Sequence, residues 1–314
     1  MQIGPTVVLD THAEAFAARY ARLVITAVDD YWVEMAVRSL TGYGTSVIGC
    51  DAEAGVERLL RPADTPDGRP GAAVMLFNFS TEKLAVAVAG RVGQCVLTCP
   101  TTACFNGLPD ASESVPLGKY VRFFGDGNES QESRAKSQEP KGSGSRLSTL
   151  DSRLLWRIPV MDGEFLVDDV AGVGRGIAGG NLILHAESQA AGLEGACRAI
   201  DALRPLAGVI TPFPGGVSRA GSKVGSKYKN LVASTQQTYC PTLRDRVETE
   251  LVDGATCAYE IVIDGVDEAA VGAAMLCAME AAAGRGVLAI GAGNYAGRLG
   301  KHNIRLHDLL RSDT

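Results

Sequence analysis

The sequence predicts an α+β protein made of two similar lobes. Three observations support this fold class: a β-α-β order in each half of the chain, a polar segment between the halves, and a Cys-Pro-Thr turn that occurs at 99–101 and again at 240–242. Each half follows the split βαβ plan, in which helices cover one face of an antiparallel sheet. We therefore expect two ferredoxin-like lobes from an internal duplication, with the active-site cleft between them.

Composition places the chain among globular proteins with an ample core. Its 314 residues suffice for two domains, and 46% of them are apolar against 21% charged. The net charge of -6 argues against a nucleic-acid partner, and no apolar run approaches the about 20 residues that span a bilayer. The first residues lack the basic region of a signal peptide. We therefore expect a cytoplasmic protein whose eight cysteines are reduced, with no membrane partner.

Strands and helices alternate in the first half. Asp29 or Asp30 can cap a helix whose apolar residues recur at helical spacing up to Leu40. The predicted elements are a strand at 23–28, this helix at 29–40, a strand at 46–50, a loop at 65–71, a strand at 72–79, a helix at 82–96 and a strand with a turn in 115–127.

A polar segment separates the two halves. From about residue 128 to 153 apolar residues are nearly absent, so this segment cannot bury enough surface to offset its ordering entropy. We interpret it as a surface excursion or linker. The expected domains are therefore residues 1–150, including most of this excursion, and residues 151–314.

The second half repeats the order of the first. Its helix has a predicted apolar stripe at Leu193, Ala196, Cys197, Ile200 and Leu203. The predicted elements are a strand at 181–186, this helix at 189–203, strands at 209–211, 230–235 and 259–264, a helix at 267–283 and a strand at 286–290.

Two short patterns invite a cofactor interpretation that their context does not favour. The glycines of 174–179 match G-x-G-x-x-G, but a strand follows them instead of the helix that a dinucleotide site needs. Cys95, Cys99 and Cys104 form the only cysteine cluster, and their spacing is not that of a structural zinc site. For these three cysteines a place in the core is favoured over metal or redox chemistry.

The stretch at 208–235 is the strongest candidate for a binding loop. Two prolines stiffen its entrance, four glycines permit positive φ, and serines, lysines and an arginine supply hydrogen-bond donors. Its segment GVSRAGSK resembles a phosphate loop, but Ser precedes Lys and no helix follows. An anionic or carbonyl-rich organic ligand is favoured, with a solvated basic loop as the alternative.

Glu260 is the candidate acid or base of the chain. In the strand at 259–264 it lies between apolar residues, where desolvation would raise the pKa of its carboxyl. From the residues alone, an exposed Glu260 on the wet face of a strand is the more common arrangement. Asp264 and Asp267 are expected to serve a turn and a helix cap.

Long motifs occur throughout the chain. They are LVITAV (23–28), TPDGRPG (65–71), GRVGQCVLTCPTTACF (90–105), FFGDG (123–127), GVITPFPGGV (208–217), GSKVG (221–225), CPTL (240–243), YEIVIDGVDE (259–268) and GNYAGRLGK (293–301). Together they resemble the family of formylmethanofuran:tetrahydromethanopterin formyltransferase, over nearly the whole chain except the polar excursion. The sequence looks more similar to the bacterial members, which are subunits of a formyltransferase/hydrolase complex.

This resemblance implies an enzyme that moves a formyl group between N5 of tetrahydromethanopterin and the amine of methanofuran or an analogue. Both would be cosubstrates, and no metal or prosthetic group is implied. The subunit would form a dimer or tetramer and join other subunits of the complex. A non-catalytic scaffold that only holds one of the two carriers is the alternative.

The resemblance also implies site residues. The catalytic carboxylate of the family carries over onto Glu260, as a general acid and base for a tetrahedral intermediate. Candidate substrate contacts lie in the two Cys-Pro-Thr turns and in the loop after residue 212. They are Cys99, Thr101, Thr102, Phe213, Pro214, Gly215, Gly216, Ser222, Lys223, Cys240 and Thr242.

Overall fold

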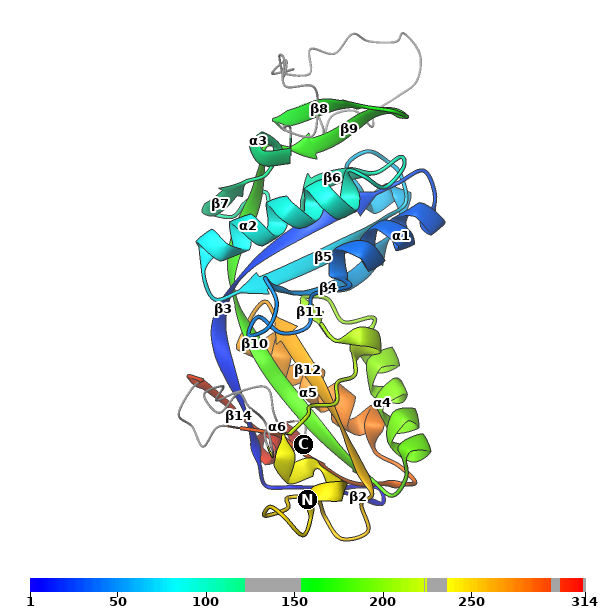
Figure 1. Cartoon of the computed structure of the whole chain (residues 1–314), viewed down its shortest axis with the longest axis vertical. Coiled ribbons are helices and arrows are strands. Elements are labelled where there is room, and N and C mark those ends of the chain that lie inside the picture. The colour runs from blue at the N-terminus through cyan, green and yellow to red at the C-terminus, as the bar shows by residue number, and fades with distance from the viewer. Residues whose placement is uncertain (122–153, 223, 225–235, 295–299, 313–314) are drawn as a thin grey trace. The chain divides into compact units, whose positions relative to one another are not determined.

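The chain, described by a computed structural model, divides into two compact units (Figure 1). The structure describes residues 1–121, 154–222, 224, 236–294 and 300–312. Unit 1 contains residues 1–18 and 176–314, and unit 2 contains residues 19–175. The units are divided near residues 18 and 175, whereas the expected boundary lay near residue 150. The N-terminus belongs to unit 1 because residues 7 and 8 pair with residues 289 and 290 in a C-terminal strand.

Unit 2 is built on a sheet whose strands lie in the order β4-β5-β3-β6-β9-β8. The neighbouring strands are antiparallel, apart from the parallel pair β6 and β9. The elements are β3 (His12–Thr26), which enters from unit 1, α1 (Asp30–Thr41), β4 (Glu53–Leu60), the 3-10 turn η1 (Pro62–Asp64), β5 (Gly71–Asn78), α2 (Thr81–Arg91), the π-helical turn η2 (Val92–Val96), β6 (Ala103–Asn106), β7 (Glu113–Pro116), α3 (Gly118–Val121), β8 (Leu155–Val160) and β9 (Gly163–Asp168).

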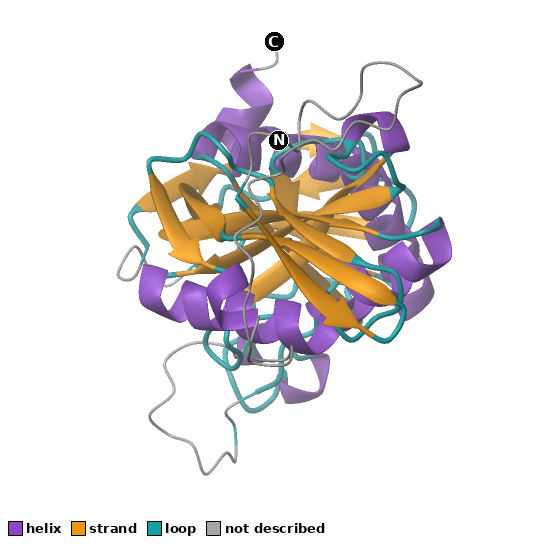
Figure 2. Cartoon of the chain, turned by 90° about the horizontal axis from the view of Figure 1, so that it is seen from above, coloured by secondary structure: helices purple, strands orange, loops and turns teal. Residues whose placement is uncertain are grey.

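Side-chain caps fix where the first two helices begin. The carboxylate of Asp29 accepts a hydrogen bond from the Trp32 N–H at 3.1 Å, as predicted for α1. The Ser80 hydroxyl does the same for the Lys83 N–H at 3.2 Å at the start of α2. Both helices pack their apolar stripes on one core with β3 and β5. Figure 2, which colours the whole chain by secondary structure, shows helices beside strands.

Two predicted strands of the first half were placed wrongly. Residues 46–50 form a turn, in which the Ser46 carbonyl accepts from the N–H groups of Gly49 and Cys50. The strand follows instead at Glu53–Leu60, where a bulge after Val56 breaks the polar–apolar alternation that would have indicated it. Within 115–127 the strand ends at Pro116 and α3 follows, and the remainder lies outside the described residues.

Unit 1 has a sheet in the order β11-β12-β10-β13-β2-β1. Its pairs are antiparallel except β13 with β2. The elements are β1 (Gln2–Ile3), β2 (Thr6–Val8), β10 (Val170–Ala186), which begins in unit 2, α4 (Gln189–Leu203), β11 (Val209–Ile210), the 3-10 turns η5 (Pro214–Gly216), η6 (Gln237–Tyr239) and η7 (Pro241–Leu243), β12 (Cys257–Gly265), α5 (Glu268–Ala282), β13 (Val287–Gly291), β14 (His302–Arg305) and α6 (Leu306–Ser312).

The central strands of the two units share one topology. In unit 2 the chain passes through β3, α1, β4, β5, α2 and β6, and in unit 1 through β10, α4, β11, β12, α5 and β13. When the four strands of each set are numbered along the chain, both sheets have the order 2-3-1-4. Each unit is therefore a mixed α+β structure with the β-α-β-β-α-β order that the sequence predicted.

Helix α4 has the predicted bounds but buries a different stripe. Leu193 is 44% exposed, and Cys197 is also exposed. Small residues take their place, because α4 approaches its neighbours closely. A Cβ on Gly192 would lie 2.8 Å from the Tyr259 ring of β12, and one on Gly195 would lie 2.7 Å from Val287 of β13. Close packing, which glycine permits, decides this stripe more than side-chain hydrophobicity does.

The glycine pattern at 174–179 lies inside strand β10. A dinucleotide motif lies instead between a strand and a helix, so this placement agrees with the sequence analysis. The pairing of β10 with β12 is irregular between Ile177 and Gly180, where a bulge places Gly179 at positive φ. Among the described residues, no helix is long and apolar enough to cross a membrane.

Candidate functional site

Glu260 is held in the middle of strand β12 by backbone pairing on both sides. On one side it pairs with Ile183 of β10. On the other, its carbonyl accepts from the Ser218 N–H at 2.7 Å and its N–H donates to the Ser218 carbonyl at 3.0 Å. The predicted binding loop is thus joined to Glu260 by a single antiparallel bridge at Ser218, which fixes the backbone from which the carboxyl projects.

The two faces of β12 have different surroundings. Ile261 and Ile263 are fully buried in one core with apolar residues of α4 and α5. Glu260 and Asp264 point to the opposite face, as the alternation predicted. Asp264 is also fully buried and accepts a hydrogen bond from the Gly179 N–H at 2.9 Å. It therefore braces the bulge of β10, which corrects the expected turn role, whereas Asp267 caps α5 as predicted.

Burial raises the pKa of the Glu260 carboxyl to about 7, while a hydrogen bond from Asn181 lowers it. The Asn181 Nδ2 donates to Glu260 Oε1 at 3.2 Å. A carboxyl with a pKa near 7 exists in both protonation states at neutral pH, so it can give up a proton and take one back. The residue as a whole is half-buried.

An aromatic pair lies near this carboxyl. His185 stands on the same face of β10 as Asn181, and its ring meets the Tyr239 ring edge to face at 5.5 Å. Burial lowers the pKa of His185 to about 4, so the ring is neutral at pH 7. Burial, Glu250 and Glu260 together raise the pKa of Tyr239, whose hydroxyl donates to Glu250. Both groups are therefore neutral neighbours of Glu260.

The His185 ring carries an orphaned polar atom. Its Nδ1 accepts from the Val252 N–H at 3.4 Å, which places the proton on Nε2. This Nε2 is buried without a hydrogen-bond partner among the described residues, and so is the Oε1 of Gln237 in η6. The segments around Tyr239, which interacts electrostatically with Glu260, thus contain a buried donor and a buried acceptor.

The Pro-Gly loop has the positive-φ glycines that its sequence predicted. Gly215 and Gly216 have φ of 64° and 78° inside the turn η5. Gly216 is buried against Ile200, whereas Pro214 and Gly215 are exposed and Phe213 is half-buried. The exposed tip is therefore free for a ligand, and the buried glycine holds the loop on α4.

The remaining residues predicted in unit 1 lie near the same loop. Ser222 accepts from the Val224 N–H at 3.0 Å, so its hydroxyl shapes the loop. Cys240 precedes η7, where its Sγ lies 3.5 Å from the Gln236 carbonyl, and Thr242 is exposed on that turn. Lys223 and the strand expected at 230–235 lie outside the described residues.

The other Cys-Pro-Thr turn lies in unit 2 and is strained. Thr101 has φ of 65°, the one non-glycine residue with positive φ in the described part of the chain. The Arg69 guanidinium donates to the Thr101 carbonyl and, at 3.0 Å, to the Thr26 hydroxyl. Asp162 accepts from the Thr101 N–H at 2.6 Å. Two segments distant in sequence therefore clamp this turn in a conformation that a β-branched residue avoids.

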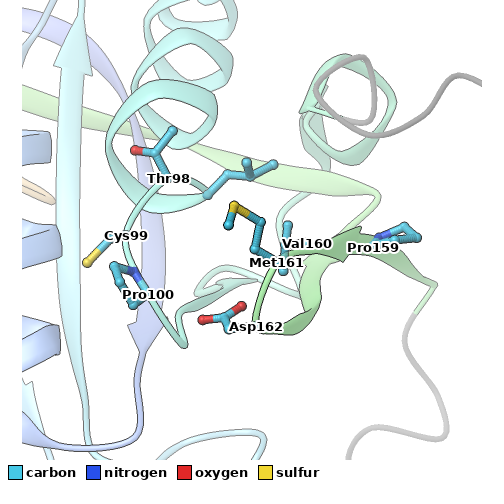
Figure 3. Close-up of a pocket in the computed structure, with 8 residues that line it drawn as sticks. Thr98, Cys99, Pro100, Pro159, Val160, Met161 and Asp162 are labelled. Atoms are coloured by element: carbon cyan, nitrogen blue, oxygen red, sulfur yellow. The ribbon is translucent and has the colours of Figure 1, made fainter.

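The turn borders an open pocket of about 770 Å³ in unit 2 (Figure 3). Met161 and Asp162, on the turn between β8 and β9, face Thr98 and Pro100 across it (Figure 3). Cys99 points away, and its Sγ lies 3.7 Å from the Trp32 carbonyl. Thr102 is buried and donates its hydroxyl to the Val96 carbonyl at 2.6 Å. The thiol of Cys99 and the hydroxyl of Thr102 are thus both directed at backbone carbonyls.

No group of three or more metal-ligating side chains occurs in the part of the chain that the structure describes. Cys95 and Cys99 pack against the core of unit 2 and Cys104 belongs to it, as expected for this cluster. Burial raises the pKa of Cys99 and Cys104. Their thiols are therefore protonated at neutral pH, which does not favour reactivity.

The structure pairs Glu260 with Ser218 of the loop at 213–222. Tyr239, which precedes the turn at 240–242, interacts electrostatically with Glu260. The turn at 99–102 belongs to unit 2, and the cleft expected between the lobes stays a prediction. Sequence reasoning missed Asn181, His185 and Arg69. The sequence did contain a sign of the first two, because they are polar residues four positions apart, and so on one face, in the otherwise apolar segment NLILHA at 181–186.

Comparison with known proteins identifies the family. Residues 1–140 match the model described as formylmethanofuran-tetrahydromethanopterin formyltransferase, and residues 163–309 match the model of the proximal lobe of the same protein. The residues between the two matches, 141–162, include the end of the polar excursion. The formyltransferase of Methanosarcina mazei is 45% identical over 98% of this chain and 100% of its own.

Two solved structures are similar over nearly their whole length. The formyltransferase of Methanosarcina barkeri matches with a TM-score of 0.86 and 43% identity over 98% of this chain and 100% of its own. The formyltransferase/hydrolase complex FhcABCD of Methylorubrum extorquens, determined with methylofuran, matches with 0.83 and 42% over 96% of both chains. The two identities are nearly equal, so they do not place the chain nearer the bacterial members. On these similarities the chain belongs to the formylmethanofuran–tetrahydromethanopterin formyltransferase family.

Proposed function

We propose that the chain transfers a formyl group between N5 of tetrahydromethanopterin and the amine of methanofuran or an analogue such as methylofuran. Membership of the family supports the reaction class. The single observation that carries the mechanism is the buried carboxyl of Glu260, whose pKa of about 7 suits proton transfer at neutral pH. Both carriers are cosubstrates, and no step needs a resident cofactor.

Formyl transfer between two nitrogens requires one net proton movement. The lone pair of the acceptor amine attacks the formyl carbon, and the carbonyl oxygen becomes an oxyanion. The bond from carbon to the donor nitrogen then breaks as that nitrogen gains a proton, while the acceptor nitrogen loses one. Glu260 gives its proton to the leaving nitrogen and recovers one from the attacking nitrogen, which leaves the enzyme unchanged at the end of the cycle.

The loop beside Glu260 is the proposed place for the substrates. Among the described candidates of unit 1, Pro214 and Gly215 at the tip of this loop and Thr242 are exposed, and Phe213 is half-buried. Lys223 stays a candidate for the carboxylates of a furan carrier. Cys99, Thr101 and Thr102 stay predicted contacts, although backbone carbonyls take up the Thr102 hydroxyl, so its contact would have to use the main chain.

We further infer that the two units are ferredoxin-like copies from one duplication, which their common strand order supports. Assembly is proposed at two levels: a homo-oligomer, and association with further subunits as in the FhcABCD complex. A cytoplasmic location belongs to the same proposal.

The test is formyl transfer by the purified protein, with wild type beside Glu260→Gln. The assay follows loss of N5-formyl-tetrahydromethanopterin with methanofuran as acceptor. General acid and base catalysis contributes about 10²–10⁴-fold, so the variant should lose activity on that scale while keeping its fold. Unchanged turnover in the variant would remove Glu260 from the chemistry. A wild type that binds the pterin without turnover would instead indicate a carrier-binding scaffold.

A further inference from the structure

Asn181 shares a sheet face with Glu260. It lies in β10 directly opposite Val262 of β12, two residues along from the pair formed by Ile183 and Glu260. Diagonal neighbours of this kind are within reach of each other across antiparallel strands. The contact is made by Asn181 Nδ2, which donates to Glu260 Oε1 at 3.2 Å.

A second hydrogen bond fixes which end of the amide faces Glu260. The Gly293 N–H, just after β13, donates to Asn181 Oδ1 at 2.9 Å. Because a backbone N–H can only donate, the oxygen of the amide must face Gly293 and the NH₂ group must face the carboxyl. A flipped amide would set two donors against each other at Gly293.

The site around this amide is closely packed. Gly293 is buried, and a Cβ on it would lie 3.1 Å from Gln236 Nε2 and 3.4 Å from Asn181 Nδ2. The Glu260 backbone is bonded on both edges, to β10 and to Ser218. Both partners of the Asn181–Glu260 contact are thus anchored to strands, so the hydrogen bond sets the orientation of the carboxyl.

A donor favours the ionised carboxyl and so opposes the effect of burial. The titratable groups near Glu260 in the described part of unit 1 are His185, Tyr239 with its partner Glu250, and Asp264. The first two are neutral at pH 7, and the two acids are not donors when ionised. Asn181 is therefore the identified group that stabilises the carboxylate.

We propose that Asn181 is a positioning residue whose amide, oriented by Gly293, holds the Glu260 carboxyl in one rotamer and stabilises its ionised form during each proton transfer. This inference rests on the proposed role of Glu260. Without the amide, the carboxyl would stay protonated to higher pH. Its orientation toward the attacking amine would also no longer be fixed, and this loss of orientation would make it recover the proton less readily.

The test is Asn181→Asp, which keeps an acceptor for the Gly293 N–H and removes the donor to Glu260. Asn181→Ala removes the amide without adding charge and serves if the first variant is poorly folded. The matched control is Asn303→Asp, the same change at an exposed position of β14. The readout is the titration of the side-chain carboxyl, followed by NMR on protein with ¹³C-labelled glutamate and assigned by its loss in Glu260→Gln.

In Asn181→Asp the carboxyl titration and the matching limb of the pH–rate profile should move upward by about one pH unit or more, as expected for loss of a charge-assisted hydrogen bond. The two acids then titrate as a coupled pair, and Asn181→Ala should shift the profile in the same direction. Asn303→Asp should leave both unchanged. Because the new aspartate also repels the Glu260 carboxylate, Asn181→Ala is the deciding variant. A titration that stays in place in Asn181→Ala, with activity reduced equally at all pH values, would overturn the inference and leave Asn181 a merely structural role.

The double variant Asn181→Asp/Glu260→Gln separates this inference from the proposed reaction. The glutamine amide introduced at position 260 can donate to the new carboxylate. At pH 8, Glu260→Gln should therefore raise the melting temperature by more in the Asn181→Asp background than in wild type, with no return of activity. An equal increase in both backgrounds would contradict the contact. If wild type transfers no formyl group and the titration still moves, the reaction fails and the Asn181–Glu260 coupling is supported.

Discussion

Glu260→Gln should stabilise the protein at high pH and leave it nearly unchanged at low pH. The carboxyl has a pKa of about 7 in the folded chain against a model value of 4.5, so the folded state binds the proton more tightly than the unfolded state does. Stability from this group is therefore fully present below pH 4.5 and is lost as the pH rises through 7. The difference of 2.5 pH units corresponds to about 3 kcal/mol.

Urea unfolding of wild type and variant at pH 4 and pH 8 measures this effect. The unfolding free energy of the variant minus that of wild type should grow by about 3 kcal/mol between the two pH values. Gln can still accept the hydrogen bond from Asn181, so the packing is retained. The exposed Glu280 of α5 provides the matched control, Glu280→Gln. A difference that stays constant between pH 4 and pH 8 would refute the desolvation of Glu260.

Two further predictions concern the segments that carry the predicted substrate contacts. Arg69→Lys removes the planar guanidinium that donates to Thr101, Thr26 and Asp67, and should lower the unfolding free energy measured in urea by about 1–3 kcal/mol. The control Arg61→Lys, at a side chain that is 82% exposed, should lower it by less than about 0.5 kcal/mol. Equal losses in the two variants would contradict the clamping of the Thr101 turn by Arg69. Gly216→Ala places a Cβ 2.4 Å from Ile200 Cδ1 at a position with positive φ, and should lower the unfolding free energy measured by thermal unfolding by about 2–4 kcal/mol. Gly215→Ala, with open space around it, should lower it by about 1 kcal/mol. Similar losses in the two variants would mean that the loop does not rest on α4.

Local patterns predicted the elements that local physics determines. Helix α4 has the predicted bounds, and Asp29 and Asp267 cap their helices as expected. The placement of Glu260 on a strand with Ile261 and Ile263 on the other face also followed from alternation. Each of these features depends on residues within one turn or a few positions along one strand, so the sequence is enough to infer it.

The features that were missed depend on contacts between distant segments. Strand β2 is three residues long and is a strand because it pairs with β13, more than 270 positions later. Arg69 reaches Thr101 across 32 positions, and Asn181 reaches Glu260 across 79. The apolar neighbours of Glu260 did suggest a raised pKa, but burial is its largest cause, and the strand pattern alone left an exposed Glu260 as the more common arrangement. No local pattern encodes such contacts.

The pH dependence of formyl transfer tests the central claim, that the buried carboxyl of Glu260 moves the proton. Single-turnover rates of wild type and Glu260→Gln are to be measured from about pH 5 to about pH 9, with enzyme in excess over the formyl donor and the acceptor at saturation. The wild-type profile should inflect near pH 7, and the residual rate of the variant should lack that inflection. An inflection near pH 7 that persists in Glu260→Gln would assign the proton transfer to another group and contradict the account.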